Sequence, residues 1–228
     1  MKKTLLILSS ILVIGCSSNK DSMTISGNVD GLMKGTLYLQ AKRDSLLFNL
    51  DSINLRGDGN FKLSTEIIEP DIYYLYLSKQ DGDSLNDIIT FFGNKGDIQI
   101  NTRLSTFDSS FEISGSENSD LLNEYNSIIR KYNMQNLDLL EIFYNAQIEN
   151  NQTRIDSVNS ELENLIRKKY LYTLNFSITN SGNEISPYIA VSQIPDANVD
   201  LLRKVYDTLP ESIKDSKYGK ILKEITID

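Results

Sequence analysis

The sequence predicts an α+β protein in which an N-terminal antiparallel β-sandwich or barrel is followed by an α-helical region. Two observations predict this class. Over residues 24–115, apolar and polar side chains alternate, and turn residues recur about every 8–12 positions, as in sandwiches and small barrels. Over residues 116–228, apolar side chains recur every three or four positions, as in amphipathic helices. We therefore place a domain boundary near Gly115.

The first half contains about eight strand-like runs. Residues 48–55 and 61–67 flank the string Arg56–Asn60, and its Asp-Gly pair predicts a hairpin turn between them. The apolar and aromatic run Ile72–Leu77 predicts a buried central strand, with Ile72, Tyr74 and Tyr76 on one face and Tyr73, Leu75 and Leu77 on the other. The alternative is an exposed tyrosine row that stacks against a sugar or a protein partner. The other runs are 24–29, 36–41, 87–92, 97–101 and 111–114.

Helical periodicity begins after Gly115, where either Ser116 or Ser119 is expected to cap the first helix. Apolar positions 121–132 and 137–144 lie on this helix, and positions 155–174 lie on a second long one. A short helix is expected from Ser186-Pro187, and it must end before Pro195. Residues 199–209 and 218–225 supply two more helices.

Residues 1–15 have the features of a signal peptide. Lys2 and Lys3 precede the apolar run Thr4–Ile14, which is too short to span a bilayer. The run ends at Gly15-Cys16, which resembles the bacterial lipobox, whose cysteine becomes a lipidated N-terminus. The alternatives are an ordinary signal peptide with a chance cysteine, or an uncleaved anchor.

On the lipobox interpretation, Cys16 carries the lipid and polar residues 16–23 form a tether. Asp directly after this cysteine is a usual signal for inner-membrane retention. Because Ser17 occupies that position, we expect the outer membrane. Whether the protein faces the periplasm or the cell surface stays open.

Composition excludes several classes of function. The 228 residues contain 23 Lys plus Arg and 31 Asp plus Glu, a formal net charge of −8, so clustered cations for nucleic acid are not expected. The chain has no His, which excludes Ser-His-Asp and Cys-His catalysis and His-ligated zinc. Cys16 is the single cysteine, so a Cys-x-x-Cys redox pair is excluded as well. We accordingly predict no catalytic residue, no cofactor and no metal site.

The first half contains the short motifs Ile25-Ser26-Gly27, Gly35-Thr36-Leu37-Tyr38-Leu39, Asp51-Ser52, Asp58-Gly59-Asn60-Phe61-Lys62, Glu69-Pro70, Phe91-Phe92-Gly93-Asn94-Lys95-Gly96-Asp97-Ile98 and Ile113-Ser114-Gly115-Ser116. This set of motifs resembles a known module, the β-rich domain of unknown function at the N-terminus of Bacteroidetes-type lipoproteins. That domain usually precedes a thioredoxin-like thiol–disulfide oxidoreductase domain, which has no counterpart in this sequence, so the resemblance implies no redox activity here. The helical segments Ser186–Ala190 and Ser216–Gly219 are similar to the stretch that follows the module.

Two acidic motifs have a simpler explanation than a binding site. The cluster Asp81–Asp87 suggests a Ca²⁺ loop, but Leu85 stands where an EF-hand needs an oxygen ligand, so a solvated turn is the better interpretation. The tripeptide Arg56-Gly57-Asp58 is an integrin-binding string, yet its glycine is what a tight turn requires.

Asp followed by Ser or Thr and then a small or apolar residue resembles the O-glycosylation motif of Bacteroidetes secreted proteins. Composition alone gives roughly one such string. The alternative is that Asp-Ser pairs favour turns, which raises their number near element ends. The six candidate sites are Ser22, Ser45, Ser52, Ser84, Ser157 and Thr208.

These observations favour a lipoprotein, anchored in the outer membrane, that acts as a non-enzymatic binding module in the cell envelope. A protein partner, including a thioredoxin-like one in trans, is the first expectation. A carbohydrate or small ligand bound on the sandwich face is the alternative. A hydrolase that uses carboxylates alone has no supporting motif.

Overall fold

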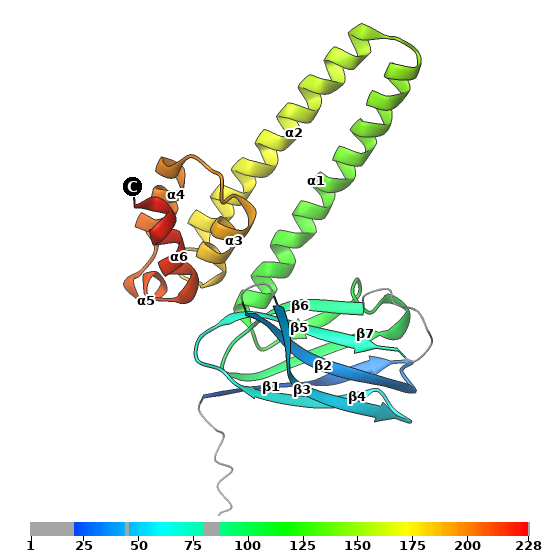
Figure 1. The fold of residues 1–228 in the computed structure, drawn as a ribbon, viewed down its shortest axis with the longest axis vertical. Coiled ribbons are helices and arrows are strands. Elements are labelled where there is room, and N and C mark those ends of the chain that lie inside the picture. Colours follow the sequence, from blue (N-terminus) through cyan, green and yellow to red (C-terminus); the bar gives the residue numbers. More distant parts are fainter. Residues whose placement is uncertain (1–20, 44–45, 80–86, 228) are drawn as a thin grey trace, which may run out of the picture.

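The computed structural model describes residues 21–43, 46–79 and 87–227. Its N-terminal part is a sandwich of two four-stranded sheets, with strand orders β4-β1-β7-β8 and β3-β2-β5-β6 (Figure 1). The predicted α+β class is confirmed, and the two sheets stay separate in the described residues instead of closing into a barrel. The strands are β1 (Ser22–Asp30), β2 (Lys34–Arg43), β3 (Leu46–Arg56), β4 (Asn60–Glu66), β5 (Asp71–Ser78), β6 (Asp87–Gly93), β7 (Gly96–Arg103) and β8 (Glu112–Ser114), with a short 3₁₀ helix, η1 (Leu104–Thr106), before β8.

The sandwich is not purely antiparallel. β1 and β7 run parallel, with Ile25 opposite Ile98, whereas the other paired strands are antiparallel. A parallel pair needs a long connection, and here the whole second sheet lies between β1 and β7 in the chain.

The predicted hairpin across Arg56–Asn60 is wrong in its pairing. The turn exists, and Gly57 adopts φ +101°, but β3 pairs with β2 while β4 pairs with β1 in the other sheet. The corner instead hydrogen-bonds to the end of β1 and to the β1–β2 loop. The amide of Val29 in β1 donates to the carbonyl of Gly59 (2.9 Å), and the amide of Gly57 donates to the carbonyl of Met33 in the loop (3.0 Å). The chain therefore crosses from one sheet to the other at this turn.

The core between the sheets consists of alternate side chains from both, as the two-residue period requires. Strand β5 lies inside its sheet, and Leu75 and Leu77 are 0% and 2% exposed in this core. Tyr73 joins them, while Ile72 belongs to a second apolar cluster on the opposite face. The predicted split of the two faces of this strand is therefore confirmed, and so is its buried central position.

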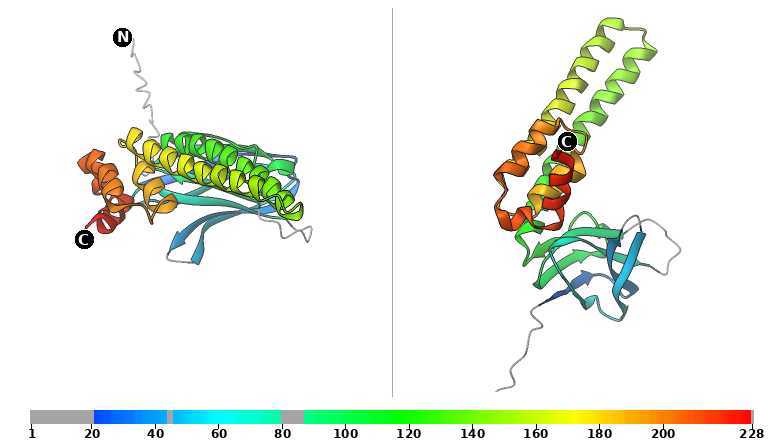
Figure 2. Two further views of the ribbon diagram at one scale, coloured as in Figure 1. Left: turned by 90° about the horizontal axis from the view of Figure 1, so that it is seen from above. Right: turned by 60° about the vertical axis from the view of Figure 1, so that its left-hand side comes forward.

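The helical region starts with a long antiparallel hairpin. Its helices α1 (Glu117–Ile148) and α2 (Gln152–Thr179) have 32 and 28 residues, so α1 is about 48 Å long at 1.5 Å per residue. The remaining helices pack beside the base of α2, and the distal part of the hairpin projects away from them (Figures 1 and 2). None of the described helices is long and apolar enough to cross a membrane. The remaining helices are α3 (Ile185–Gln193), α4 (Val199–Thr208), α5 (Glu211–Lys214) and α6 (Lys217–Thr226).

Helix boundaries follow the expected end signals. Of the two candidate caps, Ser116 is the one that caps α1, because its hydroxyl accepts from the amide of Ser119 (3.2 Å). Helix α3 ends at Gln193, before Pro195, as predicted. The four-residue helix α5 was not expected from the sequence.

Candidate functional site

The helical region meets the sandwich at an aromatic cluster, which we call the junction. Phe92 at the end of β6 contacts Tyr188 of α3 and Tyr218 of α6, with ring centroids 5.8 and 6.2 Å apart. The two tyrosine rings are 4.9 Å from each other in an edge-to-face arrangement. Ile72, Leu122 and other apolar side chains complete the cluster. Aromatic pairs of this geometry stabilise an interface beyond the area that they bury, so the two regions are firmly packed here.

A pair of serines fixes α1 to the open edge of β6. The Ser119 hydroxyl accepts from the amide of Phe92 and donates to its carbonyl, both at 2.9 Å. The Ser116 hydroxyl donates to the same carbonyl at 2.7 Å. All three bonds are buried, so the first turn of α1 satisfies the backbone groups of an edge strand that would otherwise lack partners.

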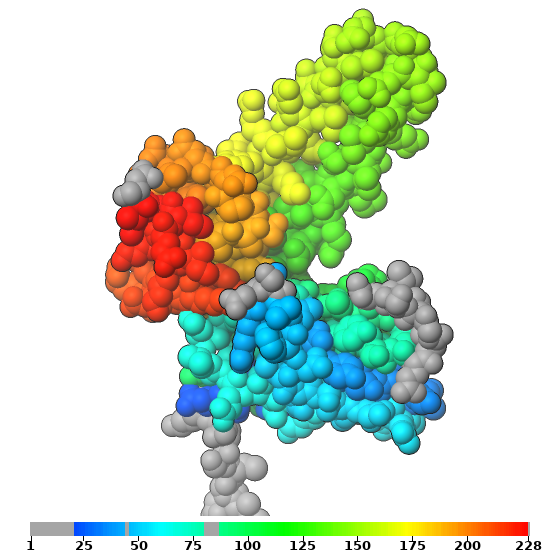
Figure 3. Space-filling model, viewed as in Figure 1, coloured from blue at the N-terminus to red at the C-terminus, as the bar shows by residue number. Residues whose placement is uncertain are grey.

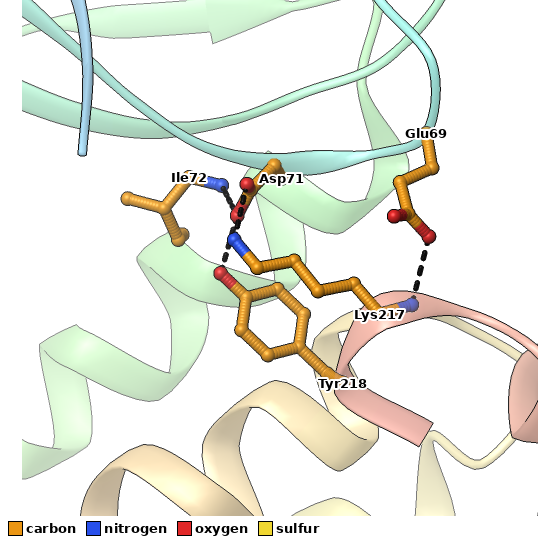
Figure 4. Close-up of polar contacts among 5 residues, drawn as sticks. All are labelled: Glu69, Asp71, Ile72, Lys217 and Tyr218. Carbon is orange, nitrogen blue, oxygen red and sulfur yellow. Dashed lines mark hydrogen bonds and ion pairs between the residues drawn. The ribbon is translucent and has the colours of Figure 1, made fainter. Parts of the chain in front are cut away.

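Asp71 at the start of β5 joins the sheet to α6 (Figure 4). Its carboxylate accepts from the amide of Ile72 at 2.7 Å, from the ammonium group of Lys217 at 2.5 Å, and from the hydroxyl of Tyr218. Glu69 adds a second link by accepting from the amide of Lys217 at 2.8 Å. The two carboxylates therefore hold the N-terminus of α6, where a helix dipole favours negative charge.

Burial shifts the tyrosines of the junction toward their neutral forms. It raises the pKa of the Tyr218 hydroxyl above its ordinary value, and the hydrogen bond to Asp71 raises it further. Burial likewise raises the pKa of Tyr188, as does neighbouring Tyr74. These hydroxyls are hydrogen-bond donors at neutral pH, and the one on Tyr218 is already used by Asp71.

Two adjoining hollows flank the Asp71–Lys217 pair. Both hollows are bordered by Lys42 as well as by the pair itself. One has a volume of about 430 Å³ and is bordered by Arg43, Glu66 and Ile68, among others. The other, of about 370 Å³, is bordered by Tyr74, Tyr188, Ser192 and Tyr218 in addition to Ile72. We call the two together the junction cleft. Its walls mix cations, carboxylates and tyrosine rings, a composition suited to binding a polar ligand or a peptide.

The outer sheet face beyond the junction carries a tyrosine pair. Tyr38 of β2 lies opposite Tyr76 of β5, and their half-buried rings stack with centroids 5.9 Å apart and planes 24° from parallel. Tyr74 lies two residues from Tyr76 on the same face, opposite Gln40. Of the three tyrosines in residues 72–77, only Tyr74 and Tyr76 are partly exposed. The alternative of an exposed tyrosine row is therefore limited to these two residues and Tyr38.

Strand β3 presents apolar side chains at a sheet edge. Leu46, Leu47 and Phe48 are 66%, 50% and 42% exposed, and the guanidinium of Arg43 lies 5.9 Å from the Phe48 ring centre. β3 is the outermost strand of its sheet, paired along one side with β2. We call these three residues the β3 edge. A long edge strand with exposed apolar residues is a surface at which another chain can add a strand.

The candidate modification sites are far apart. Ser22 starts β1 and is partly buried, whereas Ser52 on β3, Ser157 on α2 and Thr208 at the end of α4 are exposed. Cys16, Ser45 and Ser84 lie outside the described residues, as do the signal peptide 1–15 and residues 16–20 of the tether.

The two acidic motifs add no site. Arg56-Gly57-Asp58 forms the exposed corner between β3 and β4. Of the cluster Asp81–Asp87, only Asp87 is described, and its carboxylate lies 2.5 Å from the ammonium group of Lys79. Within the described ranges, no three His, Cys, Asp or Glu side chains are arranged to hold a metal ion.

No catalytic motif of the sequence marks the junction, although several of its residues stand in the short motifs quoted above. Glu69-Pro70 meets Ser216–Gly219, and the segment from Phe91 meets both Ser116 and Tyr188. The sequence signal for the junction is therefore the whole set of short motifs, because motifs from the sheet and from the helices come together at the junction.

Comparison with known proteins covers the β-rich part. Residues 23–122 match the family model of a domain of unknown function, DUF4369. The match extends from Met23 in β1 through β8 into the first turns of α1, including the serines that bind Phe92. No curated protein and no solved structure matches the chain. The similarity thus supports a domain class defined by its fold, without an assigned activity.

Proposed function

We propose that the protein is a non-enzymatic binding module of the cell envelope, held at the outer membrane by a lipid on Cys16. The lipobox-like end of the apolar run supports the anchor, because charge, length, small residue and sole cysteine agree. Only residues 17–21 separate that cysteine from β1, which begins at Ser22. Five residues extend at most about 18 Å, so the sandwich would stay close to the bilayer.

The observation that carries the binding role is the β3 edge. Leu46, Leu47 and Phe48 are exposed together at the start of β3, which pairs there with the end of β2 at Arg43, a residue of the junction cleft. Burying such side chains against a partner gains roughly 25 cal/mol per Å² of apolar surface. The edge supplies backbone hydrogen bonds and the side chains supply specificity, which is how a partner strand is recognised.

The polar groups of the junction favour binding over catalysis. Asp71 is engaged by Lys217 and Tyr218 and holds the helical region in place. A carboxylate that serves as a general base at neutral pH needs a raised pKa and an accessible proton acceptor. Asp71 instead accepts from three donors, two of which come from the helical region, so its carboxylate connects the two regions.

The proposed partner is an envelope protein, in the first place one of the thioredoxin-like group. The resemblance supports this choice, since the β module it identifies is normally fused ahead of such a domain. A chain that carries the β module can then act as an accessory that binds such a domain in trans.

The experiment retains partners on immobilised protein that begins at Ser17, using solubilised envelope of the native host. We expect wild type and Met33→Asp to retain a Cys-x-x-Cys protein, because Met33 is exposed on the β1–β2 loop, at the other end of β3 from Leu46–Phe48. Leu47→Asp should reduce retention by about tenfold, because a charge on the edge opposes strand addition. Equal retention by all three proteins would contradict the role of the β3 edge.

A carbohydrate or small ligand is the second candidate, favoured by the stacked pair of Tyr38 and Tyr76. Tyrosine rings provide a flat apolar face with a polar edge, which suits a sugar ring. On a glycan array, Tyr76→Ala should lose any signal of the wild type. Tyr144→Ala is the control, because that tyrosine is 58% exposed on the distal hairpin. Signals unchanged by Tyr76→Ala would exclude this face as the binding site.

A further inference from the structure

One side of α1 carries a regular row of exposed residues. Met134, Leu137, Tyr144 and Ile148 are 66%, 64%, 58% and 78% exposed, although all four are large and apolar. Together with the exposed charged residues Arg130 and Glu141, they recur at spacings of four and three, the heptad pattern of helices that pack side by side. We call the full row the α1 stripe: Arg130, Met134, Leu137, Glu141, Tyr144 and Ile148.

The stripe is distinct from the contact between α1 and α2. The buried side chains of that contact include Tyr125, Ile129 and Ala146 on α1 and Val158 and Leu165 on α2. The stripe lies on the distal part of the hairpin, which projects away from the sandwich and from α3–α6 (Figures 1 and 3). Nothing in the described chain therefore covers it.

Helix α2 adds to the same face of the hairpin. The ammonium group of Lys169 donates to the side-chain oxygen of Asn133 at 3.0 Å, which bridges the two helices on one side. Ile166, 66% exposed, lies one turn from Lys169, and Leu137 lies one turn from Asn133. The opposite face is different, because a polar hollow there is bordered by Gln135, Asp138, Glu161, Asn164 and Lys168.

The order of charges along the stripe makes it self-complementary. Arg130 and Glu141 stand on either side of the pair Met134 and Leu137, at equal distances along the helix. When two copies of the stripe run antiparallel about a two-fold axis between Met134 and Leu137, Arg130 of each copy faces Glu141 of the other. Met134 then faces Leu137 in both directions, so the four central residues of the stripe match their counterparts in charge and in apolar contact.

We propose that the distal α1–α2 hairpin is a dimerisation arm that pairs antiparallel with the arm of a second copy of this chain. The four helices then form an antiparallel bundle, with the α1 stripes and the two copies of Ile166 at its centre. The proposal is independent of the binding role of the β3 edge, because that edge lies on the sandwich.

The test measures the oligomeric state by sedimentation equilibrium, on protein that begins at Ser17 and so retains every described residue. Wild type should be a dimer. Leu137→Arg should be a monomer, because it puts two cations at the axis, whereas Gln135→Arg on the opposite face should remain a dimer. A monomeric wild type at the highest soluble concentration would overturn the proposal, as would equal loss of the dimer in both variants.

A charge exchange tests the antiparallel arrangement itself. Arg130→Glu and Glu141→Arg should each weaken the dimer by about tenfold, since each places like charges opposite one another. The double variant should restore the wild-type dissociation constant, because it re-forms both pairs with reversed signs. Both positions are exposed, so circular dichroism should show an unchanged fold. A double variant that is weaker than either single one would contradict the antiparallel pairing.

Discussion

Lys217 donates from its ammonium group to the carboxylate of Asp71 at 2.5 Å, although 146 residues separate them in the chain. The Asp71 side chain is 22% exposed and that of Lys217 is 37% exposed, so the pair is only partly screened by water. Together with the bond from Tyr218, this contact fixes the orientation of the helical region on the sandwich.

Replacing Asp71 by Asn should loosen the junction. The change keeps the shape of the side chain but removes the charge that neutralises Lys217, and it weakens the bond from Tyr218. We expect a loss of about 1–3 kcal/mol in the free energy of unfolding, measured by urea titration. Asp108→Asn, at an exposed position, should change it by less than about 0.5 kcal/mol. Equal effects of the two changes would show that the pair contributes nothing.

Replacing Ser119 by Ala should separate α1 from β6. Both the amide and the carbonyl of Phe92 lose a buried partner, and Ser116 then serves the carbonyl alone. The expected cost is about 1–3 kcal/mol, with faster amide hydrogen exchange at Phe92. The matched control is Ser127→Ala on the same helix, whose hydroxyl donates only to the exposed carbonyl of Glu124. Unchanged exchange at Phe92 would contradict the assignment.

Alkaline pH should destabilise the fold through Tyr125. Burial raises its pKa from 10 to about 12, so the unfolded chain loses this proton first as pH rises. Its contribution to the free energy of unfolding, on the order of 2 kcal/mol, is complete below about pH 10 and is lost as the pH passes 12. Tyr125→Phe should flatten the fall in unfolding free energy between about pH 9 and 12. A slope that Tyr125→Phe leaves unchanged would exclude this tyrosine as its source.

Cys16→Ala should abolish lipid attachment. The thiol is the only group in the chain able to form the thioether, so the precursor should accumulate or a soluble form should be released. Membrane fractionation with intact-mass measurement in the native host checks this. A wild-type protein without lipid mass, together with a variant that still fractionates with the outer membrane, would refute the anchor.

O-glycosylation is expected at exposed Asp-Ser or Asp-Thr sites, of which Ser157 offers the best comparison. It lies on α2 close to Ser160, which is equally exposed but follows Asn rather than Asp. Ser157→Ala should remove a glycan mass from the corresponding fragment of native protein, and Ser160→Ala should not. An unmodified mature mass in the wild type would rule out all the candidate sites.

The alternation of apolar residues and the helix-end residues correctly predicted structure within single elements. The alternation in residues 72–77 correctly placed Leu75 and Leu77 in the sandwich core and Ile72 on the other face, because side-chain direction in a strand depends only on a two-residue period. Helix ends were similarly predictable from Ser116 and Pro195. These signals act within a few residues, so they can be interpreted without knowing the fold.

Long-range relationships were not predictable in the same way. Alternation does not say which strands pair, so the assignment of β3 and β4 to different sheets and the parallel pairing of β1 with β7 were missed. Helical periodicity counted Leu137 and Tyr144 among packed apolar positions, yet both are exposed. Nor did any local feature indicate that Asp71 meets Lys217. Each of these depends on how distant segments fold together.

The central claim is that the protein acts by binding an envelope protein at the β3 edge. The most direct measurement is photo-crosslinking in cells of the native host, with a photoreactive residue at Leu47 and, as the control, at the exposed Lys62 of β4. The account predicts one covalent adduct with a thioredoxin-like envelope protein from position 47 and none from position 62. No protein adduct at position 47, or the same adduct from both positions, would contradict it.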